Sequence, residues 1–89
     1  MVTGRRSQIE IINDILNISK EGAKKTDILY KGNFSYKLLQ DYISFMKEKK
    51  MIEEVYVKDN GNSCRLFKPT HKGLVFLEES NNLLEKFIY

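Results

Sequence analysis

The sequence predicts a mainly α-helical domain with one β-hairpin, an α+β fold class. Three observations predict it. Apolar residues recur at helical spacing in three segments before residue 50 and in a fourth after residue 70. Between them, residues 52–58 alternate apolar and polar side chains, and an Asn-Gly turn follows. The chain has 89 residues, which is room for one domain of this kind.

The first two helices are expected near the N-terminal end. Ser7 and Glu10 have the spacing of a capping box, so a helix should start at residue 6 or 7 and run to about residue 20. Glu21-Gly22 follows as a stop signal. A second, shorter helix is expected over residues 24–31.

A third helix is expected from Ser35 to about Lys49. Ser35 is a favourable N-cap residue, and Phe34 and Leu39 are placed to form a hydrophobic staple. One face is an apolar stripe of Leu38, Leu39, Tyr42, Ile43 and Met46. The opposite face carries Lys37, Gln40, Ser44 and Lys47. Asp41 is the only acidic residue expected near this polar face.

The hairpin follows the third helix directly. Its strands are expected over residues 52–58 and 64–68, joined by Asp59-Asn60-Gly61-Asn62, because Asn and Gly adopt positive φ at low cost. Pro69 ends the second strand, and Thr70 caps a fourth helix that runs to the end of the chain. Three helices followed by a hairpin form the layout of a winged helix-turn-helix.

The fourth helix carries more apolar surface than one small domain can cover. One stripe contains Leu74, Leu77, Leu84 and Ile88, and a second, about 100° round the helix, contains Phe76, Leu83 and Phe87. The first helix has a similar surplus. We therefore expect residues 1–70 to form the winged domain and residues 71–89 to pack on it as a dimerisation helix. The expected dimer contacts are Phe76, Leu83, Leu84, Phe87 and Ile88. The alternative is a monomer with a few exposed apolar side chains.

Composition indicates a globular intracellular protein. Hydrophobic residues make up 42% of the chain and charged residues 30%. No apolar run reaches the roughly 18 residues that a membrane span needs, and no signal-peptide core is visible. One cysteine, Cys64, and one histidine, His71, cannot build a zinc site, so neither a metal nor another cofactor is expected. We expect a cytoplasmic, nucleoid-associated location.

The charge distribution favours nucleic acid as a partner. The net charge is +3 and the pI is near 9.0. Thirteen basic and nine acidic residues precede His71, whereas two basic and three acidic residues lie in the final segment. The positive charge therefore lies on the part of the fold that would contact DNA.

The candidate DNA contacts fall into three groups. On the third helix they are Ser35, Tyr36, Lys37, Gln40, Ser44 and Lys47. On the wing they are Tyr56, Lys58, Arg65 and Lys68, and the backbone candidates are Arg5, Arg6, Lys24 and Lys25. Lys donates to guanine, Gln pairs with adenine, and Ser bonds a base edge or a phosphate. The alternative for each residue is a solvated side chain without a DNA contact.

The residue inventory indicates no enzyme. Glu53-Glu54 and Glu78-Glu79 are adjacent pairs, so their side chains diverge and suit no paired-carboxylate mechanism. Cys64 and His71 are the only conceivable nucleophile and base, with no third group to orient them. The glycines form no phosphate-binding loop. No small-molecule substrate is indicated.

Several segments resemble a known family. They are RRSQIEII at 5–12, GAKKTDILY at 22–30, FSYKLL at 34–39, MIEE at 51–54 and PTHKGLVFL at 69–77. In their order and spacing the chain resembles the archaeal winged-helix DNA-binding regulator family, which includes the small dimeric chromatin-associated DNA-binding protein of Sulfolobales. The resemblance implies double-stranded DNA binding through the third helix and wing, and dimerisation through the C-terminal helix.

These features predict a homodimer that binds double-stranded DNA as a transcriptional regulator or nucleoid protein. The third helix would enter the major groove, and flanking Lys and Arg would contact phosphates. The competing hypothesis is a winged helix that docks another protein through the same apolar surfaces and does not bind DNA.

Overall fold

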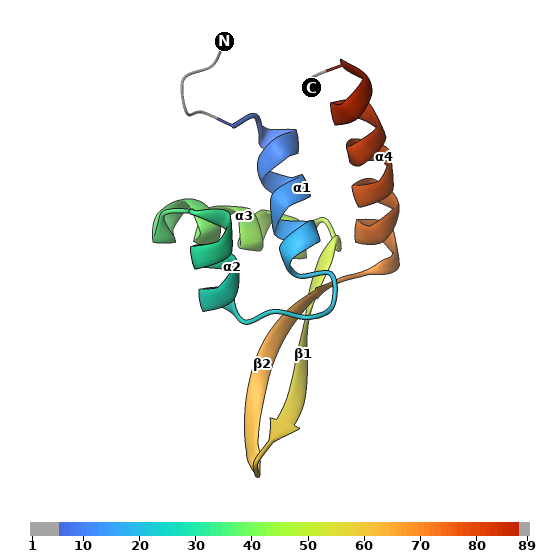
Figure 1. Cartoon of the computed structure of the whole chain (residues 1–89). Coiled ribbons are helices and arrows are strands. Elements are labelled where there is room, and N and C mark those ends of the chain that lie inside the picture. Colours follow the sequence, from blue (N-terminus) through green and yellow to red (C-terminus); the bar gives the residue numbers. More distant parts are fainter. Residues whose placement is uncertain (1–5, 88–89) are drawn as a thin grey trace.

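The computed structural model describes residues 6–87, which form four helices and a two-stranded antiparallel hairpin. This is the winged helix-turn-helix that the sequence predicts. The elements in chain order are α1 (Gln8–Ile18), α2 (Lys25–Gly32), α3 (Tyr36–Glu48), β1 (Ile52–Asp59), β2 (Asn62–Pro69) and α4 (His71–Phe87). In Figure 1, α1 lies between α2 and α4, and the hairpin projects away from the helices.

The predicted helix caps are confirmed. The Ser7 hydroxyl accepts a hydrogen bond from the Glu10 backbone N–H at 3.2 Å, and the Glu10 carboxylate accepts one from the Ser7 N–H at 3.0 Å. The Thr70 hydroxyl accepts from the Gly73 N–H at 3.1 Å and donates to the Lys50 carbonyl at 2.6 Å. Thr70 therefore both starts α4 and joins it to the corner between α3 and β1.

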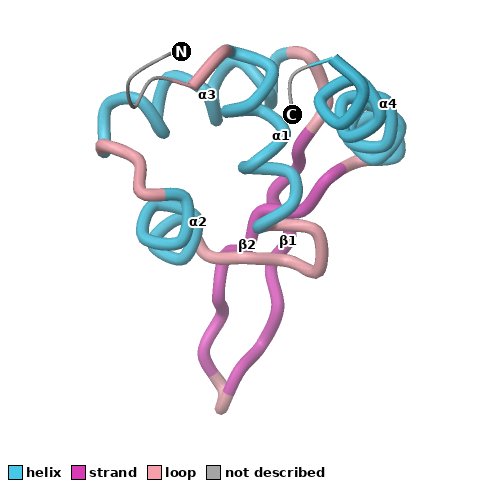
Figure 2. The backbone as a smooth tube through the Cα atoms, turned by 45° about the horizontal axis from the view of Figure 1, so that its top comes forward, coloured by secondary structure: helices cyan, strands magenta, loops and turns pink. Residues whose placement is uncertain are grey.

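The hairpin has the register that its turn predicts. Asp59 pairs with Asn62, and Asn60 and Gly61 between them have φ values of 54° and 83°. The sequence did not predict one further pairing. Ala23, in the α1–α2 loop, exchanges two backbone hydrogen bonds with Phe67 of β2, at 3.0 and 2.8 Å. Figure 2 shows this loop crossing the hairpin near its base.

The core is formed by side chains from all four helices and the base of the hairpin. Its fully buried large side chains include Ile15, Leu16, Ile28, Leu39 and Met46. The apolar stripe predicted for α3 faces this core, with Ile43 also buried and Leu38 and Tyr42 half-buried. The polar face of α3 is consequently turned toward solvent.

The expectation of a large free apolar surface on α1 is wrong. Ile11, Ile12, Ile15 and Leu16 are buried, and Ile9 is the exposed apolar residue of this helix. The physical reason is that α4 packs along α1 and covers the side that the other helices leave open. Among the residues described, no helix combines the length and apolarity that crossing a bilayer requires.

Candidate nucleic-acid interface

The polar face of α3 is open to solvent. Lys37, Gln40, Ser44 and Lys47 are all exposed. Tyr36 at the start of the helix is 65% exposed. The Ser35 hydroxyl accepts a hydrogen bond from the Leu38 N–H at 3.2 Å, so it acts as the N-cap of the helix. This face therefore presents exposed hydrogen-bond donors and acceptors, the kinds of group that contact base edges and phosphates.

Three predicted contact residues from α2 and α3 lie together. The Lys25 ammonium donates a hydrogen bond to the Gln40 side-chain oxygen and lies 5.0 Å from the centre of the Tyr36 ring. Lys24 is exposed at the N-cap of α2, beside this group. The N-terminal end of α2 and the first turns of α3 therefore form one basic and polar surface, where helix N–H groups also favour anions.

A second group lies between α3 and the wing, around Glu54. The Lys47 ammonium donates to one Glu54 carboxylate oxygen. The Tyr56 hydroxyl donates to the other oxygen at 3.4 Å, and the Arg65 guanidinium is 3.5 Å from it. The hydrogen bond from Lys47 holds the pKa of the Glu54 carboxyl below its ordinary value, and the charges of Lys47 and Arg65 lower it further, with burial acting against them.

The expectation that Asp41 is the only acidic residue near the polar face of α3 is therefore wrong. Asp41 does pair with Lys37, at 3.3 Å on the exposed helix surface. Glu54 was missed because it lies outside the helical repeat of α3, seven residues after Lys47, and reaches Lys47 only because β1 turns back beside the helix. The alternation of side chains along β1 predicts that Glu54 and Tyr56 lie on the same face of the strand, but no short-range sequence pattern predicts that this face lies beside α3.

The hairpin divides the predicted wing residues between its two faces. Side chains directly opposite in an antiparallel pair lie on the same face, and residues alternate between faces along each strand. Tyr56 is opposite Arg65, and Lys58 is two residues beyond Tyr56, so these three share the face that meets α3. Lys68 is opposite Glu53 and lies on the other face. Tyr56, Lys58 and Arg65 thus extend the polar surface of α3, and Lys68 does not.

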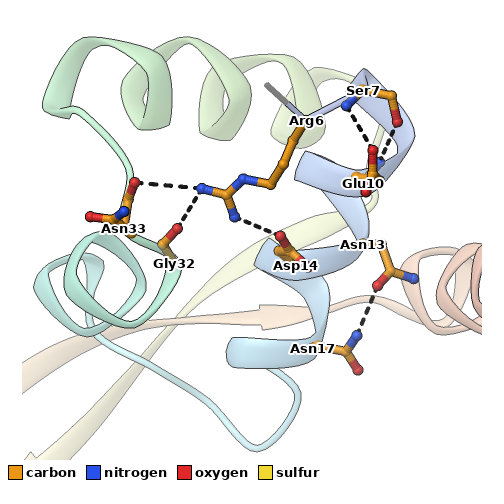
Figure 3. Close-up of polar contacts among 8 residues, drawn as sticks. All are labelled: Arg6, Ser7, Glu10, Asn13, Asp14, Asn17, Gly32 and Asn33. Atoms are coloured by element: carbon orange, nitrogen blue, oxygen red, sulfur yellow. Dashed lines mark hydrogen bonds and ion pairs between the residues drawn. The ribbon is translucent and has the colours of Figure 1, made fainter. Parts of the chain in front are cut away.

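Arg6 has a role within the fold that the sequence did not suggest. Its guanidinium donates to the Asp14 carboxylate and to the Gly32 carbonyl, both at 2.6 Å, and to the Asn33 carbonyl at 3.5 Å (Figure 3). It also lies 4.5 Å from the centre of the Phe34 ring. These contacts cap the C-terminal end of α2 and join it to α1. Arg5 lies outside the described residues.

The residues predicted for a dimer contact differ in exposure. Leu83 is 42% exposed and Phe87 is 74% exposed, while Phe76 is half-buried. Leu84 is buried within the chain, so it has no free surface for a partner and its assignment to the contact is corrected. Ile88 lies outside the described residues. Phe76 and Leu83 line a shallow groove between α4 and the start of α1, where Ile9 completes the apolar lining.

The described residues bring together no ligand set for a metal. Within residues 6–87, no three His, Cys, Asp or Glu side chains lie close enough to hold an ion. Cys64 is a free, partly buried thiol on β2. Between α3 and the wing, two cations and a hydroxyl donor converge on the single carboxylate of Glu54, so donors outnumber acceptors there.

The fold and this surface define a small winged-helix protein with a candidate nucleic-acid interface. A profile of the winged helix-turn-helix family matches residues 5–87. The chain belongs to the winged helix-turn-helix family. An uncharacterized protein of the archaeon Methanocaldococcus jannaschii is 39% identical over 63 residues, or 70% of this chain and 60% of that protein. The chain thus spans less than two thirds of that relative's length.

Solved structures of regulators and DNA-binding proteins share the fold. Sso10a-2, a DNA-binding protein from Sulfolobus solfataricus, matches with a TM-score of 0.74 and 19% identity over 90% of this chain and 80% of its own. The PcaV transcriptional regulator from Streptomyces coelicolor matches with a TM-score of 0.73 and 14% identity over 97% of this chain and 60% of its own. ZitR of Lactococcus lactis matches with a TM-score of 0.71 and 13% identity, again over 97% of this chain and 62% of its own.

The family match, the archaeal relative and the likeness to Sso10a-2 confirm the predicted resemblance to archaeal winged-helix proteins. At such identities the solved structures establish the fold, and the interface itself is argued from the residues of this chain.

Proposed function

We propose that this protein binds double-stranded DNA as a homodimer and acts as a transcriptional regulator or nucleoid-associated protein. The observation that carries the proposal is the set of exposed polar and basic side chains on α3, the start of α2 and one face of the wing, joined by contacts between these elements. A winged helix presents these same elements to a duplex, with α3 in the major groove and the wing on the neighbouring backbone.

Within this interface, α3 reads the bases. Lys37, Gln40 and Ser44 lie exposed along the face that is turned away from the core. Lys donates to guanine, and Gln recognises adenine by a pair of hydrogen bonds. Binding would require Gln40 to exchange its contact with Lys25 for a base edge, which releases the Lys25 ammonium for a phosphate.

The phosphate contacts flank this helix. Lys24 and Lys25 lie at the N-terminal end of α2, where the helix dipole adds to their charge. Lys58 and Arg65 lie on the wing face that continues from α3. Arg6 has a lesser part in this interface, because its guanidinium is used within the fold. With DNA as the partner, the protein would be located in the nucleoid.

The homodimer would form through α4. Leu83 and Phe87 expose apolar surface near the C-terminal end of this helix, and the groove between Ile9 and Phe76 continues it. Symmetric pairing of this flank with a second copy would remove the apolar area from water. Since α4 lies on the side of α1 opposite to α2, pairing through α4 leaves the α2–α3 surface free for DNA.

A titration of a labelled random-sequence duplex by fluorescence anisotropy, at low and moderate salt, tests DNA binding. We expect binding at low salt that weakens as the salt concentration rises. In a plot of log affinity against log salt concentration, each phosphate contact should contribute about −0.9 to the slope. Lys37→Glu and Arg65→Glu should each weaken binding severalfold. Lys86→Glu, an equal charge change on exposed α4, is the matched control and should have a small effect.

The competing function is a protein-interaction module without DNA binding. The apolar flank of α4 favours it, because exposed apolar surface also serves a different protein partner. The same titration separates the two functions. Absence of duplex binding at both salt concentrations, or unchanged affinity in both charge-reversal variants, would reject the DNA interface.

A further inference from the structure

Glu54 is an acidic residue that lies among cations and donors of the surface between α3 and the wing. Its carboxylate receives the Lys47 ammonium from α3, the Tyr56 hydroxyl from its own strand and the Arg65 guanidinium from β2. The Glu54 side chain is 18% exposed, whereas those of Lys47 and Arg65 are 46% and 51% exposed. The donors are therefore accessible to a ligand, while the carboxylate that they surround is sheltered.

The chemistry of these three donors matches that of a phosphate site. An ammonium, a guanidinium and a phenol hydroxyl are the groups with which proteins hold the phosphates of a nucleic-acid backbone. A carboxylate is the nearest protein equivalent of a phosphate, since it offers two charged acceptor oxygens to the same donors. A glutamate carboxylate is already charged at neutral pH at its ordinary pKa, and the hydrogen bond from Lys47 and the cationic neighbours lower the pKa of Glu54 further.

We propose that Lys47, Tyr56 and Arg65 form one phosphate-binding site between α3 and the wing, and that Glu54 occupies this site in the free protein. This inference rests on the proposed DNA binding and assigns the role of one side-chain cluster within that interface. When a duplex binds, a backbone phosphate takes the place of the Glu54 carboxylate, which turns out to solvent.

The exchange lowers the affinity for every duplex and leaves the ratio of specific to non-specific affinity unchanged. Displacing Glu54 costs the same free energy on every duplex, because phosphates are identical along the backbone. Base contacts from Lys37, Gln40 and Ser44 are separate from this site and are unaffected. Glu54 therefore weakens specific and sequence-independent binding by the same factor.

The neighbouring residue provides a matched control. Glu53 precedes Glu54 on β1, is exposed, and lies on the opposite face of the hairpin, across from Lys68. Among the described residues, Glu53 makes no ion pair or side-chain hydrogen bond. Glu53→Gln and Glu54→Gln change the net charge equally. Any difference between their affinities for duplex DNA therefore depends on the position of the carboxylate and not on its charge alone.

The experiment titrates a random-sequence duplex with wild type, Glu53→Gln and Glu54→Gln over a range of salt. Glu54→Gln should bind about threefold to tenfold more tightly than wild type, as expected when exposed ion pairs no longer compete. For Glu54→Gln, the slope of log affinity against log salt concentration should steepen by about 0.9 to 1.8, because one or both of the Lys47 and Arg65 side chains become free to contact phosphates. Glu53→Gln should bind less than about twofold more tightly, because its carboxylate lies on the opposite face of the hairpin from the three donors.

A second variant pair tests the identity of the site. Lys47→Gln should weaken binding more strongly in the Glu54→Gln background than in wild type, because the ammonium contacts phosphate fully only when the carboxylate is removed. Glu54→Ala should repeat the tighter binding of Glu54→Gln. Circular dichroism of each variant verifies that it is folded.

The outcomes distinguish this inference from the function on which it rests. Equal affinities for Glu53→Gln and Glu54→Gln, while wild type binds DNA, would overturn the phosphate site and leave the DNA interface intact. Weaker binding by Glu54→Gln would also overturn it, because the carboxylate would then be positioning Lys47 and Arg65. A wild type without duplex binding at low salt would reject the proposed function itself.

Discussion

Arg6 connects two helices through a single guanidinium. It bonds Asp14 on α1 and the carbonyl of Gly32 at the end of α2, and it lies over the ring of Phe34. The carbonyls at a helix C-terminus lack partners within the helix, and Arg6 supplies donors to two of them. A residue that a charge pattern assigns to DNA thus has a clear role in holding α2 against α1.

Replacing Arg6 should consequently affect stability before it affects DNA binding. We expect Arg6→Ala to lower the free energy of unfolding by about 1–3 kcal/mol, because two charge-assisted hydrogen bonds are lost. Arg6→Lys should recover only part of the loss, since an ammonium cannot span both acceptors. Urea unfolding followed by circular dichroism measures this. Lys20→Ala, at an exposed site, is the control, and an equal effect in both variants would contradict the role of Arg6.

Gly73 is a second residue whose role comes from its surroundings. A Cβ built at this position would lie 2.0 Å from the Met51 carbonyl oxygen and 3.0 Å from its carbon. The obstacle is backbone, which a side-chain rotation cannot relieve. The first turn of α4 can therefore approach the start of β1 only because residue 73 has no side chain.

Gly73→Ala should destabilise the fold although alanine favours a helix. Helix propensity alone would stabilise the variant by about 1 kcal/mol. We expect instead a loss of about 1–3 kcal/mol, because α4 must move away from Met51. Thermal or urea unfolding measures the sign. Val75→Ala, at an exposed position of the same helix, serves for comparison, and a stabilised Gly73→Ala would show that the contact with Met51 is relieved at low cost.

At the scale of elements, α4 is held on α1 by polar groups within an apolar contact. The buried Asn13 amide donates to the Ser80 hydroxyl at 2.7 Å and to the Asn81 side-chain oxygen at 2.8 Å. Asn17 donates to the Asn13 side-chain oxygen at 2.9 Å, as Figure 3 also shows. Apolar side chains tolerate sliding between helices, whereas these hydrogen bonds exist in one register, so they fix where α4 lies along α1.

Asn13→Ala should therefore lower the free energy of unfolding by about 1–3 kcal/mol, because buried groups lose their partners. Asn82→Ala, on the exposed side of α4, should have little effect. In an Asn13→Ala background, Ser80→Ala should cost less than it does in wild type, since the two side chains interact directly. Chemical denaturation of the four variants measures the coupling, and strictly additive losses would contradict the network.

At the scale of the whole molecule, two different surfaces lie on different sides of α1. The basic and polar surface involves α2, α3 and the wing, while the apolar flank belongs to α4 and the start of α1. A dimer formed through α4 would place two α3 helices on one assembly, and the separation between them would set the spacing of the DNA half-sites.

Sedimentation tests this arrangement. We expect wild type to sediment as a dimer at micromolar concentrations and Leu83→Glu to sediment as a monomer, because a buried carboxylate without a partner opposes association. Val75→Glu, on a different side of α4 and also exposed, should leave the dimer intact. A monomeric wild type would remove the dimer from the proposed function.

Local sequence signals predicted each element of the fold. The capping box of Ser7 and Glu10, the hydroxyl of Thr70 and the turn at Asn60-Gly61 all act within a few residues, so their consequences are readable without a structure. The same turn sets the hairpin register, which places Lys68 on a different face from Tyr56. That separation was available from the sequence once alternation was followed from the turn.

The helices, the hairpin and the polar face of α3 follow from the amino-acid sequence, because periodicity and capping depend on near neighbours. Which charges meet depends instead on how the elements pack together. Arg6 reaches Gly32, and Lys47 reaches Glu54, through the packing of separate elements. The packing of the elements also places α4 on α1 and buries Leu84. Two apolar helix faces in the same chain remove each other from water without a partner molecule.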